Sequence, residues 1–231
     1  MSAPSPLLSP VIFQLGPVPV TEEVVTTWAL VALLGLGAYL STRRLSLRPS
    51  SAAPGVAPRP GRVQAALEAV FVLLEDQIRG VTQRDPTPLV PFIGTLFLFL
   101  AVANLSSLVP GVKAPTASLE TPAALALVVF CAVHVYGVRA KGLRRYLRGF
   151  AEPTWLMLPL NVLSEITRTF SMMIRLFGNM MSHEFILAIV VALVGLLVPI
   201  PFMALGILIG LIQAYIFAIL ATVFILSLIH I

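Results

Sequence analysis

Charged side chains stand inside one of the long apolar stretches of this sequence, where an ionised group is costly. Residues 155–197 are mostly apolar, yet they contain Glu165, Arg168 and Arg175. An arginine at the centre of a bilayer costs from about 3 to more than 10 kcal/mol, so it is retained mainly where it pairs or faces water. An arginine also stays charged and stabilises the ionised form of a nearby carboxyl group. The pattern predicts that Arg175 meets a partner or water within the membrane.

The polar residues of this stretch divide between two faces of the expected helix. At 100° per residue, Arg168, Arg175 and Asn179 fall within about 40° of one another and form one stripe. Glu184 points to the opposite face, about 13 Å further along the helix, and His183 lies between the two directions. We predict that Arg175 faces a partner in the membrane, whereas Glu184 lines an aqueous pocket.

Gln213 is a polar residue in the last apolar stretch, and the midpoint between it and Arg175 is residue 194, close to the expected turn. An antiparallel pair would bring the two side chains to one depth, where a neutral amide can orient the guanidinium. Plainer interpretations stay open: snorkelling for the arginines, a neutralised interfacial carboxyl for Glu184, a packing hydrogen bond for His183, and a simple interhelical bond for Gln213.

The composition indicates a polytopic membrane protein, because 58% of the 231 residues are hydrophobic and only 11% are charged. A helix needs about 18 or more apolar residues to cross the bilayer. Five such runs occur, at residues 24–40, 89–108, 121–138, 155–197 and 201–229. The fourth would extend about 65 Å as a helix, twice the hydrocarbon thickness. We therefore expect an all-α fold whose last two helices are strongly tilted or kinked.

The net charge of +5 reflects membrane topology rather than nucleic-acid binding. Seven basic residues fall between Arg43 and Arg84, and five more between Arg139 and Arg148. The positive-inside bias assigns both segments to the cytoplasm, with the N-terminus outside and the C-terminus inside. No Lys or Arg precedes Arg43, so the first run is expected to be a retained helix rather than a signal peptide. With Cys131 alone, neither a disulfide framework nor a thiol-ligated metal site is expected.

We expect a single membrane domain that spans residues 1–231. A helix at residues 62–79 is predicted to lie on the cytoplasmic membrane surface, although a solvated helix that touches a partner has the same pattern. The segments are an external N-terminus (1–23), a first span (24–41), a cytoplasmic linker with the surface helix (42–88), a hairpin of two spans (89–138), a basic cytoplasmic loop (139–154) and a tilted hairpin that faces a partner (155–231).

Several blocks of the sequence resemble subunit a of F-type ATP synthases. The main block is RLFGNM at residues 175–180. The others are PFIGTLFLF at 91–99, Asn104 through Pro110-Gly111, PTA at 115–117, Tyr136-Gly137 through Lys141-Gly142, and QAYIF at 213–217. Together the blocks cover most of residues 61–225. Two positions depart from the family pattern: Thr169 stands where proline is common, and His183 with Gly206 reverses the glycine and histidine of some bacterial members.

The resemblance implies a non-catalytic, proton-translocating stator subunit in a bacterial inner membrane, with ATP chemistry on other subunits and no cofactor or metal. Its expected partners are a ring of c subunits that carry carboxyl groups, the peripheral-stalk b subunits and the lipid bilayer. Arg175 would be the essential stator charge between two offset half-channels. The implied proton path consists of Glu184, His183, Asn179, Gln213, Glu165 and Arg168.

Three other functions remain to be weighed. A sodium-coupled form of the same subunit is possible, because ion selectivity would reside mainly in the ring. A stand-alone transporter or channel is disfavoured by the absence of internal repeats and by the lone central arginine. A membrane scaffold without transport would not need that arginine.

Overall fold

The computed structural model describes residues 11–15, 18–42, 62–82, 87–108, 114–151, 154–195 and 199–230. The predicted irregular linker at 42–60 lies outside this part of the chain, except for Thr42. The described helices and strands are β1 (Val11–Leu15), β2 (Val18–Thr21), α1 (Glu22–Thr42), α2 (Arg62–Thr82), α3 (Val90–Leu105), η1 (Ser106–Leu108), η2 (Pro115–Ala117), α4 (Glu120–Lys141), α5 (Leu143–Ala151), α6 (Met157–Val194) and α7 (Pro199–His230).

Within this part of the chain, five helices are long and apolar enough to cross a membrane: α1, α3, α4, α6 and α7. The predicted all-α polytopic fold is therefore confirmed. A small antiparallel pair of strands, β1 and β2, precedes α1 and was not predicted. Its signal in the sequence is an apolar run interrupted by the turn dipeptide Gly16-Pro17. Thr21 Oγ1 donates to Glu120 Oε2 at 3.4 Å, which ties this pair to the start of α4.

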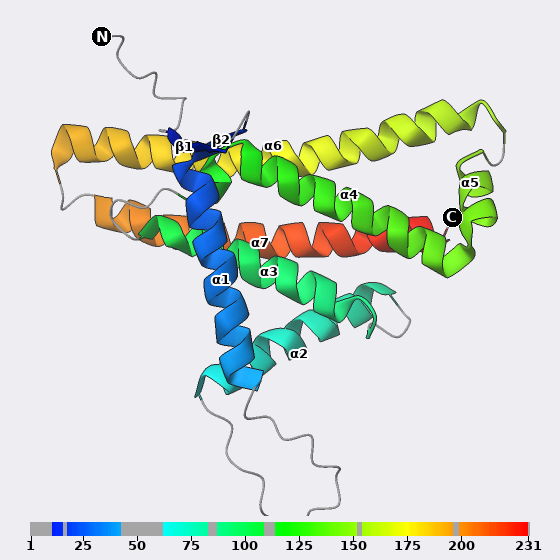
Figure 1. The fold of residues 1–231 in the computed structure, drawn as a ribbon, viewed down its shortest axis with the longest axis horizontal. Coiled ribbons are helices and arrows are strands. Elements are labelled where there is room, and N and C mark those ends of the chain that lie inside the picture. Colours follow the sequence, from blue (N-terminus) through cyan, green and yellow to red (C-terminus); the bar gives the residue numbers. More distant parts are fainter. Residues whose placement is uncertain are drawn as a thin grey trace, which may run out of the picture.

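The two longest helices, α6 and α7, lie alongside each other and run in opposite directions along the longest axis of the molecule, whereas α1 crosses them steeply (Figure 1). The 38 residues of α6 extend about 57 Å at 1.5 Å per residue. A helix of that length fits a hydrocarbon layer of about 30 Å only when it is strongly tilted. Gly195 ends α6 with φ near 80°, a conformation that glycine adopts without strain.

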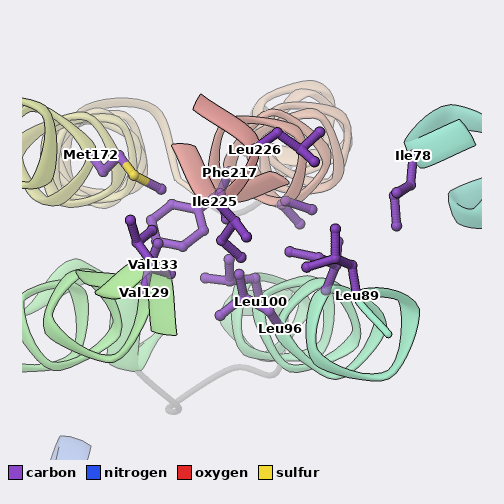
Figure 2. Close-up of a cluster of buried hydrophobic side chains, with 14 of the residues drawn as sticks. Ile78, Leu89, Leu96, Leu100, Val129, Val133, Met172, Phe217, Ile225 and Leu226 are labelled. Atoms are coloured by element: carbon purple, nitrogen blue, oxygen red, sulfur yellow. The ribbon is translucent and has the colours of Figure 1, made fainter. Parts of the chain in front are cut away.

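The core of the molecule forms around α7, which packs against α3, α4 and α6. Figure 2 shows side chains from these helices converging on α7. Ala214, Ala218 and Ala221 are fully buried, and such small residues let helices approach closely in membranes. The larger side chains of this cluster include Leu100, Val129, Val133, Met172, Leu176, Phe217 and Ile225.

Helix α6 contributes only one side to this core. In the most apolar part of α6 about 11% of the residues are buried inside the molecule, whereas the corresponding share for α7 is 39%. Large side chains such as Ile166, Phe170 and Ile174 are exposed along its outer face. An apolar surface of this kind needs lipid or another membrane protein to cover it.

Helix α2 packs across α3 and α7. Leu74 and Ile78 are fully buried, and Tyr215 Oη donates to Gln77 Oε1 at 2.8 Å. The ring of Phe71 lies over Gly94 of α3, where any side chain would collide with it. The predicted helix at 62–79 is therefore present and attached to the bundle, and its placement on a membrane surface stays a prediction.

Because Phe71 occupies the space beside Gly94, the substitution Gly94→Ala should lower the free energy of unfolding by about 1–3 kcal/mol through overpacking. Gly35→Ala is the matched control, since nothing lies within 4 Å of that position and alanine is the better helix former. Thermal unfolding of the solubilised protein and trypsin cleavage after Arg79 would measure the effect. Identical curves for the two variants would contradict the packing of α2 on α3.

Candidate functional site

Arg175 lies near the middle of α6 with an exposed side chain. Among the residues that the structure describes, its guanidinium has no hydrogen-bond or ion-pair partner. It lines a groove of about 480 Å³ on the surface of α6 and α7. The hydroxyl groups of Ser164, Thr167 and Ser171 line the same groove. The geometry presents a fixed positive charge to whatever covers this face.

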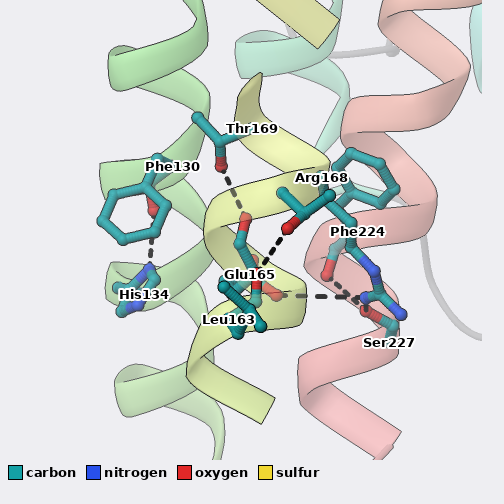
Figure 3. A network of polar contacts seen from close by, with 9 residues as sticks. Phe130, His134, Leu163, Glu165, Arg168, Thr169, Phe224 and Ser227 are labelled. Carbon is teal, nitrogen blue, oxygen red and sulfur yellow. Dashed lines mark hydrogen bonds and ion pairs between the residues drawn. The ribbon is translucent and has the colours of Figure 1, made fainter. Parts of the chain in front are cut away.

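Arg168 lines the same groove, but it is anchored. Its Nη1 donates to Ser227 Oγ at 3.3 Å and lies 3.9 Å from Glu165 Oε2. The guanidinium carbon lies 5.6 Å from the ring centre of Phe224, within the range of a cation–π contact. Figure 3 shows the side chain reaching from α6 to Ser227 on α7. Two arginines seven residues apart are thus in different states: Arg168 is tied to its own protein and Arg175 is available.

In the described chain Gln213 makes the plain interhelical hydrogen bond that the sequence analysis left open, rather than a hydrogen bond to Arg175. Asn179 Nδ2 donates to Gln213 Oε1 at 2.7 Å. The midpoint of this pair is residue 196, between the end of α6 at Val194 and the start of α7 at Pro199. The midpoint of the observed pair is two residues later than residue 194, which brings Asn179 opposite the glutamine, although α6 ends earlier and α7 begins earlier than the apolar runs at 155–197 and 201–229 predicted. Gln213 is 3% exposed, and its Nε2 has no partner among the described residues.

A polar cluster lies beyond Asn179 toward the C-terminal end of α6. Glu184 Oε1 accepts a hydrogen bond from the backbone N–H of Ala114 at 3.0 Å. Thr116, two residues after Ala114, is fully buried, and its Oγ1 donates to Asn104 Oδ1 at 2.8 Å. Asn104 Nδ2 donates in turn to the backbone oxygen of Gly210 at 2.8 Å. Glu184 thus points toward the bundle, whereas Arg175 points away from it.

His183 packs against α7 at Gly206. Its ring occupies the place where a side chain at position 206 would lie, so any larger residue there collides with the ring. His183 and Gly206, whose residue types are reversed relative to some bacterial family members, are therefore in direct contact. One ring and one glycine fill a single space between the two helices.

Glu165 is buried on the side of α6 that faces α4 and α5. His134 of α4 is close enough to act electrostatically on it, as is Tyr146 of α5. Burial, together with the Glu165 charge, raises the pKa of Tyr146 to about 12, so this phenol keeps its proton.

Sequence reasoning missed four polar residues of the site: His134, Tyr146, Asn104 and Thr116. His134 was taken as structural, and its Nδ1 does contact the backbone oxygen of Phe130 at 2.8 Å. A polar residue within an apolar run was the available signal for His134 and Asn104. Across the described ranges, no group of three or more His, Cys, Asp or Glu residues could hold a metal ion.

Comparisons with known proteins identify the family of this chain. The family described as ATP synthase A chain matches residues 24–226. ATP synthase subunit a 2 of Bradyrhizobium sp. (strain BTAi1 / ATCC BAA-1182) is 58% identical over 96% of this chain and 94% of its own length. Subunit a 1 of Chlorobaculum parvum is 46% identical over 93% and 91%, and subunit a 2 of Pelobacter propionicus is 45% identical over 93% and 89%. The chain therefore belongs to the ATP synthase A chain family, the membrane-embedded subunit a of the ATP synthase complex.

Proposed function

We propose that this chain passes ions to and from the carboxyl groups of a c-subunit ring through two offset half-channels, and that Arg175 separates them. One observation carries the proposal: an exposed guanidinium lies in the middle of an apolar helix and has no partner within the described chain. A bilayer does not tolerate such a group alone. An acidic partner in the membrane would supply the missing interaction.

The electrostatics of such a partner explain how it could carry ions. A carboxylate about 4 Å from an arginine gains roughly 4 kcal/mol at an effective dielectric near 20. This energy corresponds to about a thousand-fold change in proton affinity. A ring carboxyl would stay neutral against lipid, where burial favours the uncharged form, and would ionise beside Arg175. The fixed charge would also block direct passage of protons from one half-channel to the other.

The two half-channels are assigned to different faces of α6. The inner one is the groove lined by Ser164, Thr167 and Ser171, which runs from Arg175 toward the N-terminal end of the helix. The outer one follows Glu184 and His183, which lie toward its C-terminal end. The groove opens on the face of α6 that points away from the helix bundle, whereas Glu184 points toward the bundle. The two proposed routes are therefore offset from each other at Arg175.

The neutral pair of Asn179 and Gln213 supports this division. It lies one helical turn from Arg175 and bonds α6 to α7 without adding charge. An acid at either position would pair with the guanidinium and weaken its attraction for the ring.

We further propose that the basic segments on both sides of the α3–α4 pair lie on the cytoplasmic side of a bacterial inner membrane, as the positive-inside bias favours, and that the peripheral-stalk b subunits are further partners. The coupling ion is proposed to be the proton, with a sodium-coupled version as the alternative. Pumping that requires Na⁺ and resists a protonophore would select that alternative.

Arg175→Ala should abolish ATP-driven ion pumping in inverted membrane vesicles, because it removes the charge that ionises the ring carboxyl. Arg79→Ala is the matched control, since Arg79 lies exposed on α2 and pairs only with Glu75, at 2.7 Å, in the described chain. It should pump like the wild type. Coupled pumping that survives in Arg175→Ala would refute the proposed function.

The contact between His183 and Gly206 predicts a reciprocal effect. Gly206→His should stop pumping because two rings cannot occupy one space. His183→Gly should slow pumping because it removes the polar ring. The double variant restores one ring and one glycine, and it should pump faster than either single variant. Assembly of each complex is checked by immunoblot, and a double variant no faster than the slower single variant would contradict the shared space.

A further inference from the structure

A second cavity, which is partly open, lies behind α6, between this helix and α4 and α5. It has a volume of about 60 Å³, and its lining includes Lys141, Tyr146, Asn161 and Glu165. Ser164 and Arg168 line both this cavity and the groove that contains Arg175. The two spaces therefore meet at the Arg168 side chain, which is held by its contacts with Glu165 and Ser227.

Tyr146 of α5 forms part of the cavity lining. Its ring lies against Gly137 of α4, where any side chain would collide with it. It packs edge-on against Phe150 with ring centres 5.2 Å apart, and against His134 at 6.0 Å. The residue is only 5% exposed, and its Oη is buried with no hydrogen-bond partner in the described chain. A buried hydroxyl in this state is costly and calls for a partner in the cavity.

The cavity can supply that partner through water. A single water needs roughly 10–15 Å³ of such space and two to four polar neighbours. Tyr146, Glu165 and Asn161 all line a cavity several times larger than this minimum. Because the phenol keeps its proton, it can donate to the carboxylate or to a water bound there, and its oxygen can also accept a hydrogen bond from that water.

Helix α5 is held firmly enough to place this hydroxyl. Gly142, with φ near 80°, makes the turn between α4 and α5. Asn161 Nδ2 donates to the backbone oxygen of Phe150 at 2.9 Å, which joins the end of α5 to α6. The charged and titratable groups around Glu165 are Arg168 on its own helix, His134 and Lys141 on α4, and Tyr146 on α5.

We propose that Tyr146 is a positioning residue for ion transfer: through water in the cavity its hydroxyl orients the Glu165 carboxylate, and the inner half-channel continues past Arg168 into this cavity. The inference rests on the proposed function and extends it. It makes α5 the inner wall of the half-channel. Ions that leave the groove would reach the cytoplasm through the Glu165 cavity rather than along the outer face alone.

A double-mutant cycle in the whole ATP synthase tests this inference. Tyr146→Phe, Glu165→Gln and the double variant are compared by ATP-driven pumping in inverted vesicles. Tyr146→Phe should slow pumping about ten-fold, because a hydrogen bond to a charged group is lost. In the Glu165→Gln background the same change should have little further effect, because the two groups act together. Tyr136→Phe is the matched control, since the exposed hydroxyl of Tyr136 bonds only to the backbone oxygen of Pro88 among the described residues, and it should pump normally.

A second variant separates donation from packing. Tyr146→His keeps an N–H donor on a smaller ring and should pump faster than Tyr146→Phe. The inference would be overturned if Tyr146→His and Tyr146→Phe pumped at equal rates, or if both variants failed to assemble. It would also be overturned if Tyr146→Phe pumped at the normal rate, or if the losses caused by Tyr146→Phe and Glu165→Gln were independent in the cycle. Arg175→Ala is measured in parallel: if it still pumps, the proposed function fails, whereas a silent Arg175→Ala with a normal Tyr146→Phe refutes the positioning role alone.

Discussion

The cost of one positive charge in an apolar helix governs the arrangement of this molecule. Arg175 has no partner in the described chain, and the acids of its own helix are far away. Glu165 and Glu184 lie ten and nine residues from it, roughly 15 and 13 Å along the helix axis. Attraction falls with distance, so neither acid replaces a carboxylate at contact. The interaction that stabilises this guanidinium therefore has to come from outside the described part of the chain, which leaves that face uncovered.

The packing of the hairpin explains how such a face can stay open without loss of the fold. Helix α7 carries most of the burial, with small residues such as Ala214 and Ala218 against its neighbours. Helix α6 is bound along one side only, through Met172, Leu176 and Met180. The interhelical bond nearest Arg175 joins two neutral amides. The packing contacts of α6 thus lie on one side of the helix and the Arg175 charge on the other. The charged side is therefore free to face a moving partner.

The main outlines of the fold were predictable because they depend on one-dimensional properties of the sequence. Apolar run length predicts the spans, and the excess length of the last two predicts their tilt. The contact of Gln213 was not predictable, because moving the midpoint of the helix pairing by two residues, from 194 to 196, exchanges Arg175 for Asn179. The place of Tyr146 was also hidden, since it depends on Gly137 of another helix accepting its ring. Sequence periodicity identifies which side of a helix is apolar, but it does not identify which glycine receives which aromatic ring.

The contrast between Arg168 and Arg175 shows how one residue type can serve two purposes on a single stripe. Arg168 is held by a carboxylate, a hydroxyl and an aromatic ring, so its charge is largely satisfied within the protein. Its side chain lines both the groove and the Glu165 cavity. Arg175 lacks all three kinds of contact in the described chain, and its charge is directed outward. If an acidic group moves past this face, it meets its strongest attraction at Arg175 and a weaker one at Arg168. The difference in anchoring, more than the position of either arginine, determines where that group would ionise.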